Sequence, residues 1–232
     1  MKPLQECQLY AFVDTGYLRG RAPGAIAQQL CDGGADLIQL RAKQSSPEEV
    51  RRLAEEILPV TKRAGIGLVI NDHLSVARDV GAEFCHLGQD DFFGAGHNRI
   101  AQLATALNPS DSCAEPQTAR TLQLGIGLSS AAPEQAARAI AAGADYLGVG
   151  PVYPTGTKPT AKPVTLEYVR WAAAHVRVPW FAIGGINLGN LDDVLAAGAQ
   201  RICVVSAILN EADLATACHR FKDRLPPARP AR

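Results

Sequence analysis

The sequence predicts a single-domain α/β protein, a closed (β/α)8 or TIM barrel, on three observations. First, a phrase recurs four times, in which a helical pattern ends in Gly-Ala, followed by an acidic or amide residue and an apolar strand. The phrase starts at Gly34, Gly81, Gly143 and Gly198. Second, successive phrases are 47, 62 and 55 residues apart, about twice the length of one βα unit, so one more unit fits between each pair. Third, strands and helices alternate throughout, which is typical of a parallel sheet.

The elements follow from hydrophobic pattern and from helix-end signals. Eight apolar, β-rich runs predict strands at Leu9–Val13, Leu37–Leu40, Ile66–Ile70, Phe84–Leu87, Leu122–Ile126, Tyr146–Val149, Trp180–Ile183 and Ile202–Val205. Helices are predicted at Ala22–Cys31, Pro47–Arg63, Leu74–Val80, Asn98–Leu107, Pro133–Ala142, Leu166–Ala174, Leu191–Ala197 and Glu211–Arg224. Pro47 and Pro133 suit first-turn positions, and the glycine of each phrase is expected to end a helix with left-handed backbone angles. The rival is an open doubly wound sheet, but the fourfold recurrence favours closure.

Composition excludes several classes of protein. The chain has 232 residues, 47% of them hydrophobic, and 23 basic residues balance 23 acidic ones. A zero net charge argues against a nucleic-acid partner. Six cysteines are scattered without a C-x-x-C pair, and Cys85 and Cys203, inside apolar runs, are expected to be core thiols. No apolar signal core or membrane-spanning run occurs, so we expect a cytoplasmic protein without a membrane partner.

Two segments lie outside the repeating pattern. Asn108–Arg120 is rich in Pro, Ser and Ala and is expected to be an insertion on the amino-terminal face of the barrel. The barrel domain is expected to span residues 1–224, followed by a disordered tail at residues 225–232.

The stretch after the sixth strand carries the strongest chemical signal. Pro151 and Pro154 prevent a helix there, and the loop then presents Thr155, Thr157 and Lys158 together. Two hydroxyls, backbone N–H groups and an ammonium are suited to bind an anion. The carboxyl ends of barrel strands are where such folds place their chemistry. An ordinary polar turn is the alternative.

The end of the second strand is cationic. The two-residue period of a strand places Gln39, Arg41 and Lys43 on one side. Cations buried inside a barrel need an anion, and a diphosphate is the natural candidate. The alternative is a strand end whose cations are paired with carboxylates of the protein itself.

Carboxylates follow the third and fourth strands, whose ends are neighbours. Asp72 and Asp91 could share Mg²⁺, which takes few protein oxygens and keeps positions for substrate phosphates; Asp90 is a second candidate. Alternatively these carboxylates cap the next helices. His73 and His86 lack the spacing of a transition-metal site.

Three further loops complete the expected site. After the fifth strand, Ser129 or Ser130 either caps the next helix or contacts a substrate. Gly184 and Gly185 after the seventh strand let backbone N–H groups approach an anion, and Val204–Ala207 follows the eighth strand. Loops after strands seven and eight are the usual phosphate site of this fold.

Together these motifs resemble the thiamine-phosphate synthase family. The set comprises Gln-x-Arg-x-Lys, Ile-Asn-Asp, His-x-Gly-Gln-x-Asp, Gly-x-Gly-Pro-x-x-x-Thr-x-Thr-Lys and Ile-Gly-Gly-Ile, in this order. The resemblance runs from about Leu9 to about Phe221. It implies a transferase that condenses hydroxymethylpyrimidine diphosphate with thiazole phosphate, giving thiamine phosphate and pyrophosphate with the help of Mg²⁺.

The resemblance also implies residue roles. The pyrimidine diphosphate would be held by residues from the second, third, fifth and sixth strand ends, namely Gln39, Leu40, Arg41, Ala42, Lys43, Asn71, Ser129 and Lys158. The thiazole phosphate would be held by Thr155, Gly156, Thr157, Gly185, Val205 and Ser206. Asp72 and Asp91 would bind Mg²⁺, while Arg41, Lys43, Ser129 and Lys158 would be catalytic.

Two other functions remain open from the sequence. A thiazole tautomerase of the same fold would need no diphosphate or Mg²⁺ residues and resembles a histidine-bearing segment where this chain has Ser129–Ala132. A non-catalytic sensor of a phosphate ligand is the third function. The expected partners are small-molecule substrates, and the sequence leaves a homo-oligomer open.

Overall fold

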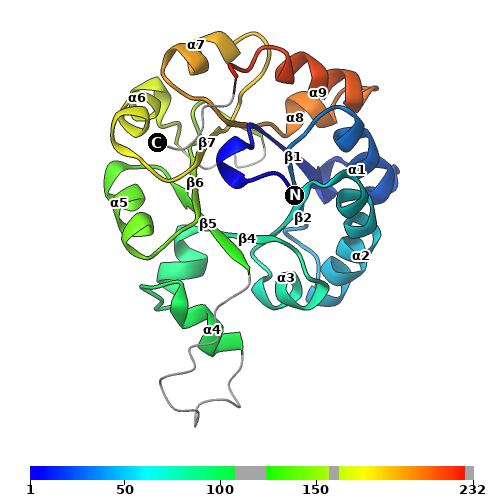
Figure 1. Ribbon diagram of the computed structural model, residues 1–232, viewed down its shortest axis with the longest axis horizontal. Coiled ribbons are helices and arrows are strands. Elements are labelled where there is room, and N and C mark those ends of the chain that lie inside the picture. Colours follow the sequence, from blue (N-terminus) through cyan, green and yellow to red (C-terminus); the bar gives the residue numbers. More distant parts are fainter. Residues whose placement is uncertain (108–123, 157–161, 228–232) are drawn as a thin grey trace.

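The computed structural model describes residues 1–107, 124–156 and 162–227. Within them, parallel strands pair in sequence order and β8 pairs with β1, so the sheet closes into the predicted barrel (Figure 1). The strands are β1 (Leu9–Asp14), β2 (Leu37–Arg41), β3 (Gly67–Asn71), β4 (Phe84–Leu87), β5 (Gly125–Ser130), β6 (Tyr146–Val149), β7 (Trp180–Ile183) and β8 (Ile202–Cys203). The helices are α1 (Pro23–Asp32), α2 (Pro47–Ala64), α3 (Leu74–Val80), α4 (Ala101–Leu107), α5 (Pro133–Ala141), α6 (Thr165–His175), α7 (Leu191–Ala196), α8 (Ser206–Leu209) and α9 (Leu214–Lys222).

Several predicted boundaries were wrong. The fourth helix begins at Ala101 rather than Asn98, and the eighth strand ends at Cys203 rather than Val205. The fifth strand was predicted at Leu122–Ile126 but spans Gly125–Ser130, so Ser129 and Ser130 lie inside the strand rather than after it. The last helix begins at Leu214 rather than Glu211, because Asp213 accepts a hydrogen bond from the Thr216 N–H at 2.9 Å and caps it. The short helix α8 before it was not predicted.

The structure tests only part of the two predictions for segments outside the barrel pattern, the insertion and the disordered tail. The predicted insertion at 108–120 lies outside the described residues. Of the predicted disordered tail, residues 225–227 are described, and the Pro226 carbonyl accepts a hydrogen bond from Gln8 Nε2. Residues 228–232 lie outside the described part, so their disorder stays a prediction. No helix in the described ranges has the length and hydrophobicity to cross a membrane.

The recurring Gly-Ala phrase ends helices and connects strands in the structure. All four of its glycines have positive φ, between 70° and 102°, as the left-handed prediction requires. In three of the four phrases the acidic residue, which we call an entry carboxylate, accepts hydrogen bonds from backbone N–H groups at the start of the preceding strand. Asp36 accepts from Leu9 at 3.0 Å, Glu83 from Leu68 at 2.8 Å and Asp145 from Ile126 at 2.7 Å. Each entry carboxylate therefore joins an odd-numbered strand to the even-numbered strand that follows it.

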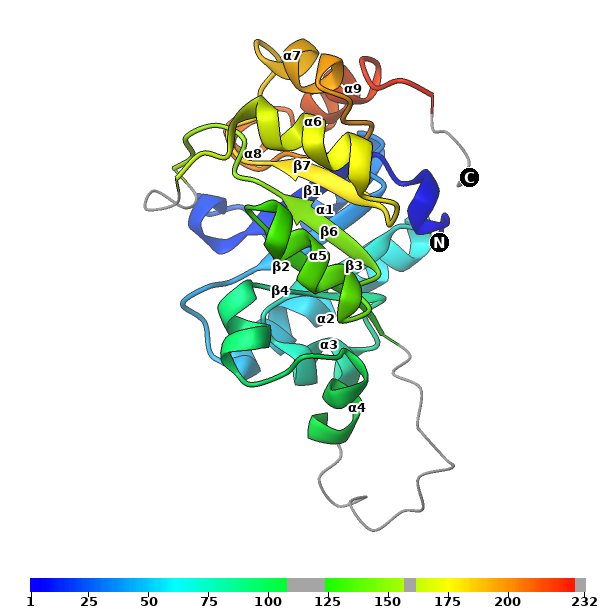
Figure 2. The ribbon, with the colours of Figure 1, turned by 90° about the vertical axis from the view of Figure 1, so that its left-hand side faces the viewer.

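Asp36 also ties the two ends of the described chain together. Besides the N–H groups of Gln8 and Leu9, its carboxylate pairs with Lys2 at 2.9 Å and with Lys222 of α9. Burial opposes ionisation of Asp36, but the hydrogen bonds from Lys222, Leu9, Gln8 and Lys2 outweigh it and lower its pKa. These contacts lie at the end of the barrel where the strands begin, beside the 3-10 helix η1 (Leu4–Glu6) (Figure 2).

Aromatic rings fill the barrel interior. Tyr146 lies at the centre, with ring centroids 6.1 Å from Tyr10, 5.8 Å from Phe84 and 5.8 Å from Phe181. Glycines on β5 make room for them, since a Cβ on Gly127 would lie 2.1 Å from Tyr146 Cζ. Glycine weakens a strand in isolation, so β5 owes its position to this packing rather than to its own β-propensity.

We predict that Gly127→Ala lowers the free energy of unfolding by about 3 kcal/mol, because the new methyl group cannot fit beside a fully buried ring. Urea unfolding followed by circular dichroism measures the loss. Gly94→Ala is the matched control, since its Cβ would meet only Asp90 Cβ at an ordinary 3.6 Å. Equal stability of the two variants would contradict the packing argument.

Candidate active site

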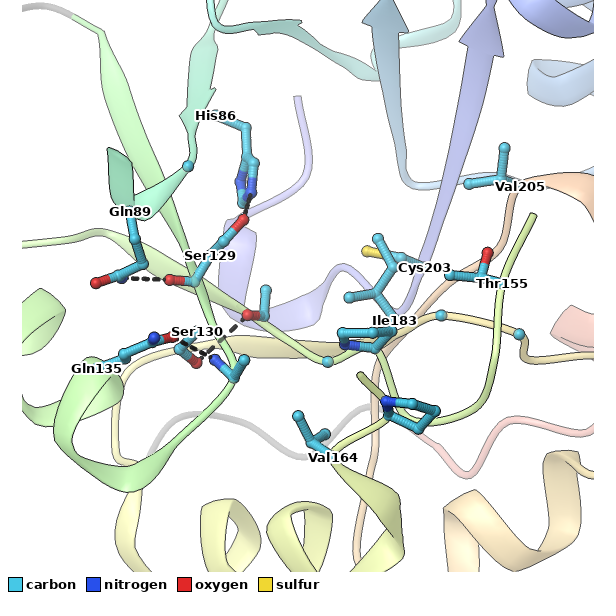
Figure 3. Close-up of a pocket in the computed structure, with 18 of the residues that line it drawn as sticks. His86, Gln89, Ser129, Ser130, Gln135, Thr155, Val164, Ile183, Cys203 and Val205 are labelled. Carbon is cyan, nitrogen blue, oxygen red and sulfur yellow. Dashed lines mark hydrogen bonds between the residues drawn. The ribbon is translucent and has the colours of Figure 1, made fainter. Parts of the chain in front are cut away.

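A cavity of about 990 Å³ opens at the carboxyl end of the barrel. Its floor is formed by the aromatic interior, including Tyr10, Phe12 and Tyr146. In Figure 3, His86, Gln89 and Ser129 lie on one side, and Thr155, Ile183, Cys203 and Val205 lie on the other. The cavity is in the place where this fold keeps its chemistry.

The cationic end of β2 enters the cavity as predicted. Gln39, Arg41 and Lys43 line it, whereas the intervening Leu40 and Ala42 are buried and do not. Both cations are paired within the protein. Arg41 Nη1 lies 2.7 Å from Asp14 Oδ2, and Lys43 Nζ lies 2.5 Å from Asp72 Oδ2. The alternative, that these cations are paired with carboxylates of the protein itself, therefore agrees with the structure, and binding of a diphosphate by them stays a prediction.

Asp72 lies in an unusual backbone conformation at the end of β3. Its φ is 64°, which is uncommon for a residue with a side chain and is typical of functional sites. Its N–H donates to the His86 carbonyl at 2.9 Å, which joins the ends of β3 and β4. Its carboxylate accepts from Asn71 Nδ2 at 2.6 Å and does not cap α3, so the capping alternative was wrong here.

Asp91 belongs to a π-helical segment, Asp90–Gly94, directly after β4. The Gly88 N–H donates to Asp91 Oδ2 at 3.1 Å, and a Cβ on Gly88 would lie 2.5 Å from the same oxygen. Phe92 and Phe93 anchor the segment in the core, and the Arg138 guanidinium of α5 lies 3.6 Å from the Phe93 ring centre. A short π-helical segment of this kind is often found at a functional site. Asp91 and Asp72 both line the cavity.

Ser129 connects β4 to β5 at the cavity wall. Its hydroxyl lies 3.0 Å from His86 Nε2, and its carbonyl accepts from Gln89 Nε2 at 2.6 Å (Figure 3). Ser130 is buried and bonds the Tyr168 hydroxyl at 2.8 Å instead. Neither serine caps α5, whose N-cap is Ala132. The capping alternative is therefore wrong for both serines; Ser129 lines the cavity, and its contact with a substrate stays a prediction.

The loops after β6, β7 and β8 form the opposite wall. Thr155, Gly185, Val205 and Ser206 line the cavity, while Gly156 does not. The Thr157 and Lys158 predictions lie outside the described residues.

Backbone pairing holds the loops after β6 and β7 against each other. The Val152 N–H donates to the Ile183 carbonyl at 2.8 Å, and the Tyr153 N–H donates to the Gly184 carbonyl at 3.0 Å. Gly184 and Gly185 have positive φ, and a Cβ on either would lie within 2.5 Å of Pro151 or Pro154. These glycines are therefore required by close packing as well as by their backbone angles.

Sequence reasoning missed a partner of one cavity residue and several cavity residues themselves. Asp14 ends β1 and is buried beside Arg41, which lines the cavity; an acidic residue closing an apolar strand was its only signal. Tyr10, Gln89 and Tyr146 also line the cavity, but in sequence they belong to ordinary strand and loop patterns.

The two cysteines inside strands are buried, as expected. Cys85 and Cys203 are buried thiols, and burial raises the pKa of both. Across the described ranges no three His, Cys, Asp or Glu side chains gather as a metal site by themselves.

A family model described as thiamine monophosphate synthase matches residues 9–105 and 109–208. The chain belongs to the thiamine monophosphate synthase family. Its relatives include the thiamine-phosphate synthase of Thermus thermophilus, 42% identical over 83% of this chain and 84% of the relative. The thiamine-phosphate synthase of Methanospirillum hungatei is 39% identical over 94% of this chain and 97% of the relative.

Solved structures agree with this family assignment. Thiamine phosphate pyrophosphorylase from Pyrococcus furiosus has a TM-score of 0.78 at 28% identity, covering 96% of each chain. A 3-hexulose-6-phosphate synthase has a TM-score of 0.62 at 18% identity, covering 94% of this chain and all of that one, which shows the barrel fold alone. The family therefore accounts for the fold and for the order of the motifs around the cavity.

We predict that Asp14→Asn destabilises this family member by about 2 kcal/mol at pH 7, because it leaves the Arg41 guanidinium half-buried without its carboxylate. Thermal or urea unfolding measures the change. Asp79→Asn is the matched control: Asp79 also pairs with arginines, at 2.6 and 2.7 Å, but is 30% exposed and outside the cavity. Its loss is expected to cost less than about 0.5 kcal/mol. Similar losses in both variants would contradict a special role for the Asp14–Arg41 pair.

Proposed function

We propose that the protein condenses hydroxymethylpyrimidine diphosphate with thiazole phosphate to form thiamine phosphate and pyrophosphate. The observation that carries the proposal is the cavity itself, which gathers Arg41, Lys43, Asp72 and Asp91 around one opening. The names of the relatives support it. A tautomerase acting on the thiazole phosphate alone would have no use for this set of charges.

In the proposed reaction the carbon–oxygen bond to the diphosphate breaks first, and the thiazole nitrogen then bonds to the freed methylene carbon. The pyrimidine supplies the electrons that stabilise the cation between these steps, so no nucleophilic Ser, Cys or His is required. The chain's task is to stabilise negative charge on the departing diphosphate and to hold the thiazole in line.

Arg41 and Lys43 are placed to receive the diphosphate. In the structure each is paired with a carboxylate, Asp14 and Asp72 respectively. An arriving diphosphate competes for these cations, and the pairing keeps their side chains oriented until then. Lys158, carried over from the family motif, would add a third cation from the loop after β6.

Gln39, Asn71 and Ser129 are proposed to orient the pyrimidine ring. All three line the cavity, and Gln39 and Asn71 are buried. Thr155, Gly185, Val205 and Ser206 on the opposite wall are proposed to hold the thiazole phosphate, with Thr157 completing the set by the resemblance. The two substrates would then face each other across the cavity.

The residues present fit Mg²⁺ as a cofactor. Asp72 and Asp91 offer two carboxylates at the cavity wall, which suits an ion that is bound by few protein oxygens together with substrate phosphates. When bound, Mg²⁺ supplies positive charge to the oxygens of the diphosphate.

A coupling assay tests the function. Purified protein is mixed with both substrates and Mg²⁺, and thiamine phosphate is detected as its fluorescent oxidation product. Mg²⁺-dependent product supports the proposal. A folded protein that forms no product would overturn it, and thiazole phosphate alone would then separate a tautomerase from a sensor.

We predict that Lys158→Ala lowers turnover at least about a hundredfold, because one preorganised charge contact to the diphosphate is lost. Steady-state kinetics with both substrates at saturation measure the change. Lys62→Ala in the last turn of α2 is the control for loss of a lysine away from the cavity and is expected to be neutral. Turnover near that of the parent protein would remove Lys158 from the mechanism.

We predict that Asp91→Asn raises the Mg²⁺ concentration needed for half-maximal activity on the order of tenfold, because it removes a ligand charge. A metal titration of activity measures this. Asp90→Asn, one residue away on the same segment, is expected to shift the titration less. The opposite ranking of the two variants would assign the metal to Asp90 instead.

A further inference from the structure

We propose that Tyr10 and Tyr146 fix the direction of the Gln39 side-chain amide, so that the cavity presents a hydrogen-bond acceptor and selects a ring with an exocyclic amino group. The proposal rests on the proposed function, since it concerns the pyrimidine substrate. It makes the two tyrosines positioning residues, which act on the substrate through Gln39.

The three side chains form one hydrogen-bonded chain at the cavity floor. Gln39 Nε2 donates to the Tyr10 hydroxyl at 2.6 Å, and the Tyr10 and Tyr146 hydroxyls lie 3.1 Å apart. The side chains come from β2, β1 and β6, and all three residues line the cavity. Their exposed fractions are 3%, 1% and 0%, so little water is available to replace these bonds.

The direction of one bond sets the direction of the next. A hydroxyl donates a single hydrogen, whereas an amide has a donating end and an accepting end. The Tyr10 hydroxyl accepts from Gln39, and at 3.1 Å either tyrosine hydroxyl can donate to the other; in the proposal Tyr10 donates its hydrogen and Tyr146 accepts it. In the reverse arrangement Tyr10 would donate to Gln39 Oε1, and the NH₂ group of Gln39 would face the cavity instead.

The structure has the first arrangement. Gln39 lines the cavity, and with its Nε2 bonded to Tyr10, the Oε1 end of the amide is the end that is left for a ligand. An amino group on a bound ring can donate a hydrogen bond to Gln39 Oε1. An oxo group at the same position cannot, because it would place one acceptor oxygen against another. Buried polar groups discriminate strongly in this situation, because the mismatched group is left without a partner.

Packing holds the rings of the two tyrosines in place. The Tyr146 ring packs against His86 at 5.6 Å and Phe181 at 5.8 Å, and Gly127 faces it from β5. Tyr10 is stacked on Phe12 at 5.2 Å. Burial raises the pKa of both tyrosines well above the ordinary value, so both hydroxyls keep their hydrogens at any working pH.

The test compares two ligands in the absence of thiazole phosphate, so it does not depend on turnover. Isothermal titration measures binding of the aminopyrimidine diphosphate and of its analogue with an oxo group in place of the amino group. We expect the parent protein to prefer the amino compound at least about a hundredfold. A parent preference below about threefold would overturn the proposal even if the coupling assay forms thiamine phosphate.

Two variants then test the tyrosines. In Tyr146→Phe the Tyr10 hydroxyl loses its acceptor and turns its hydrogen to Gln39 Oε1, so the preference should fall at least about tenfold, mainly because the amino compound binds more weakly. Tyr10→Phe should also lower the preference, because nothing then orients the amide. Tyr17→Phe, at the end of η2 (Thr15–Tyr17) and outside the cavity lining, is the matched control and should keep the parent preference.

The outcomes separate the two proposals. If the folded variants Tyr146→Phe and Tyr10→Phe prefer the amino compound over the oxo analogue as strongly as the parent protein does, the tyrosines do not orient Gln39. If one variant fails to fold by circular dichroism, the other carries the same comparison. If both fail to fold, the parent preference still tests whether the cavity presents an acceptor, and a value below about threefold overturns the proposal. If the amino preference depends on the tyrosines while the coupling assay forms no product, the role of the tyrosines in recognition is supported and the condensation reaction is rejected.

Discussion

The packing of the Tyr146 ring at the centre of the barrel is the constraint on which the site depends. The ring is fully buried and touches aromatic side chains from β1, β4 and β7. Because Gly127 leaves it room, the ring fills the barrel interior below the cavity. The cavity above thus has a rigid floor that carries a polar edge, formed by the hydroxyls of Tyr10 and Tyr146.

Charge at the cavity is balanced before any substrate arrives. Arg41 and Lys43 have Asp14 and Asp72 as partners, and Asp72 has a strained backbone that is joined to β4 through His86. Such pairing costs some affinity for anions, since a ligand must compete with carboxylates. In return the long cationic side chains are ordered in advance, which lowers the entropy lost on binding.

Sequence reasoning predicted most of the fold because local signals agreed with the global pattern. The recurring glycine phrase located four helix–strand junctions, and the strands Tyr146–Val149 and Trp180–Ile183 were placed without error. It failed at β5, where Gly125 and Gly127 exist to accommodate rings from other strands. A local sequence pattern does not indicate that a residue must leave room for rings from other strands.

The site was predicted where side chains alternate along a strand and missed where partners come from distant strands. Gln39 and Arg41 follow directly from the strand period, Lys43 comes two residues after β2 ends, and all three line the cavity. Asp14 was missed because its importance comes from Arg41, 27 residues later. Likewise, the bond between Tyr10 and Tyr146 joins positions 136 residues apart.

The entry carboxylates divide the barrel into modules of two strands. Asp36 joins β1 to β2, Glu83 joins β3 to β4 and Asp145 joins β5 to β6. A chain cut between α4 and β5 would break none of these contacts and would leave four strands on each fragment. The pair of Asp36 and Lys222 would then be one of the contacts that draw the halves together. The barrel is thus suited to fragment complementation, in which two separately expressed halves reassemble.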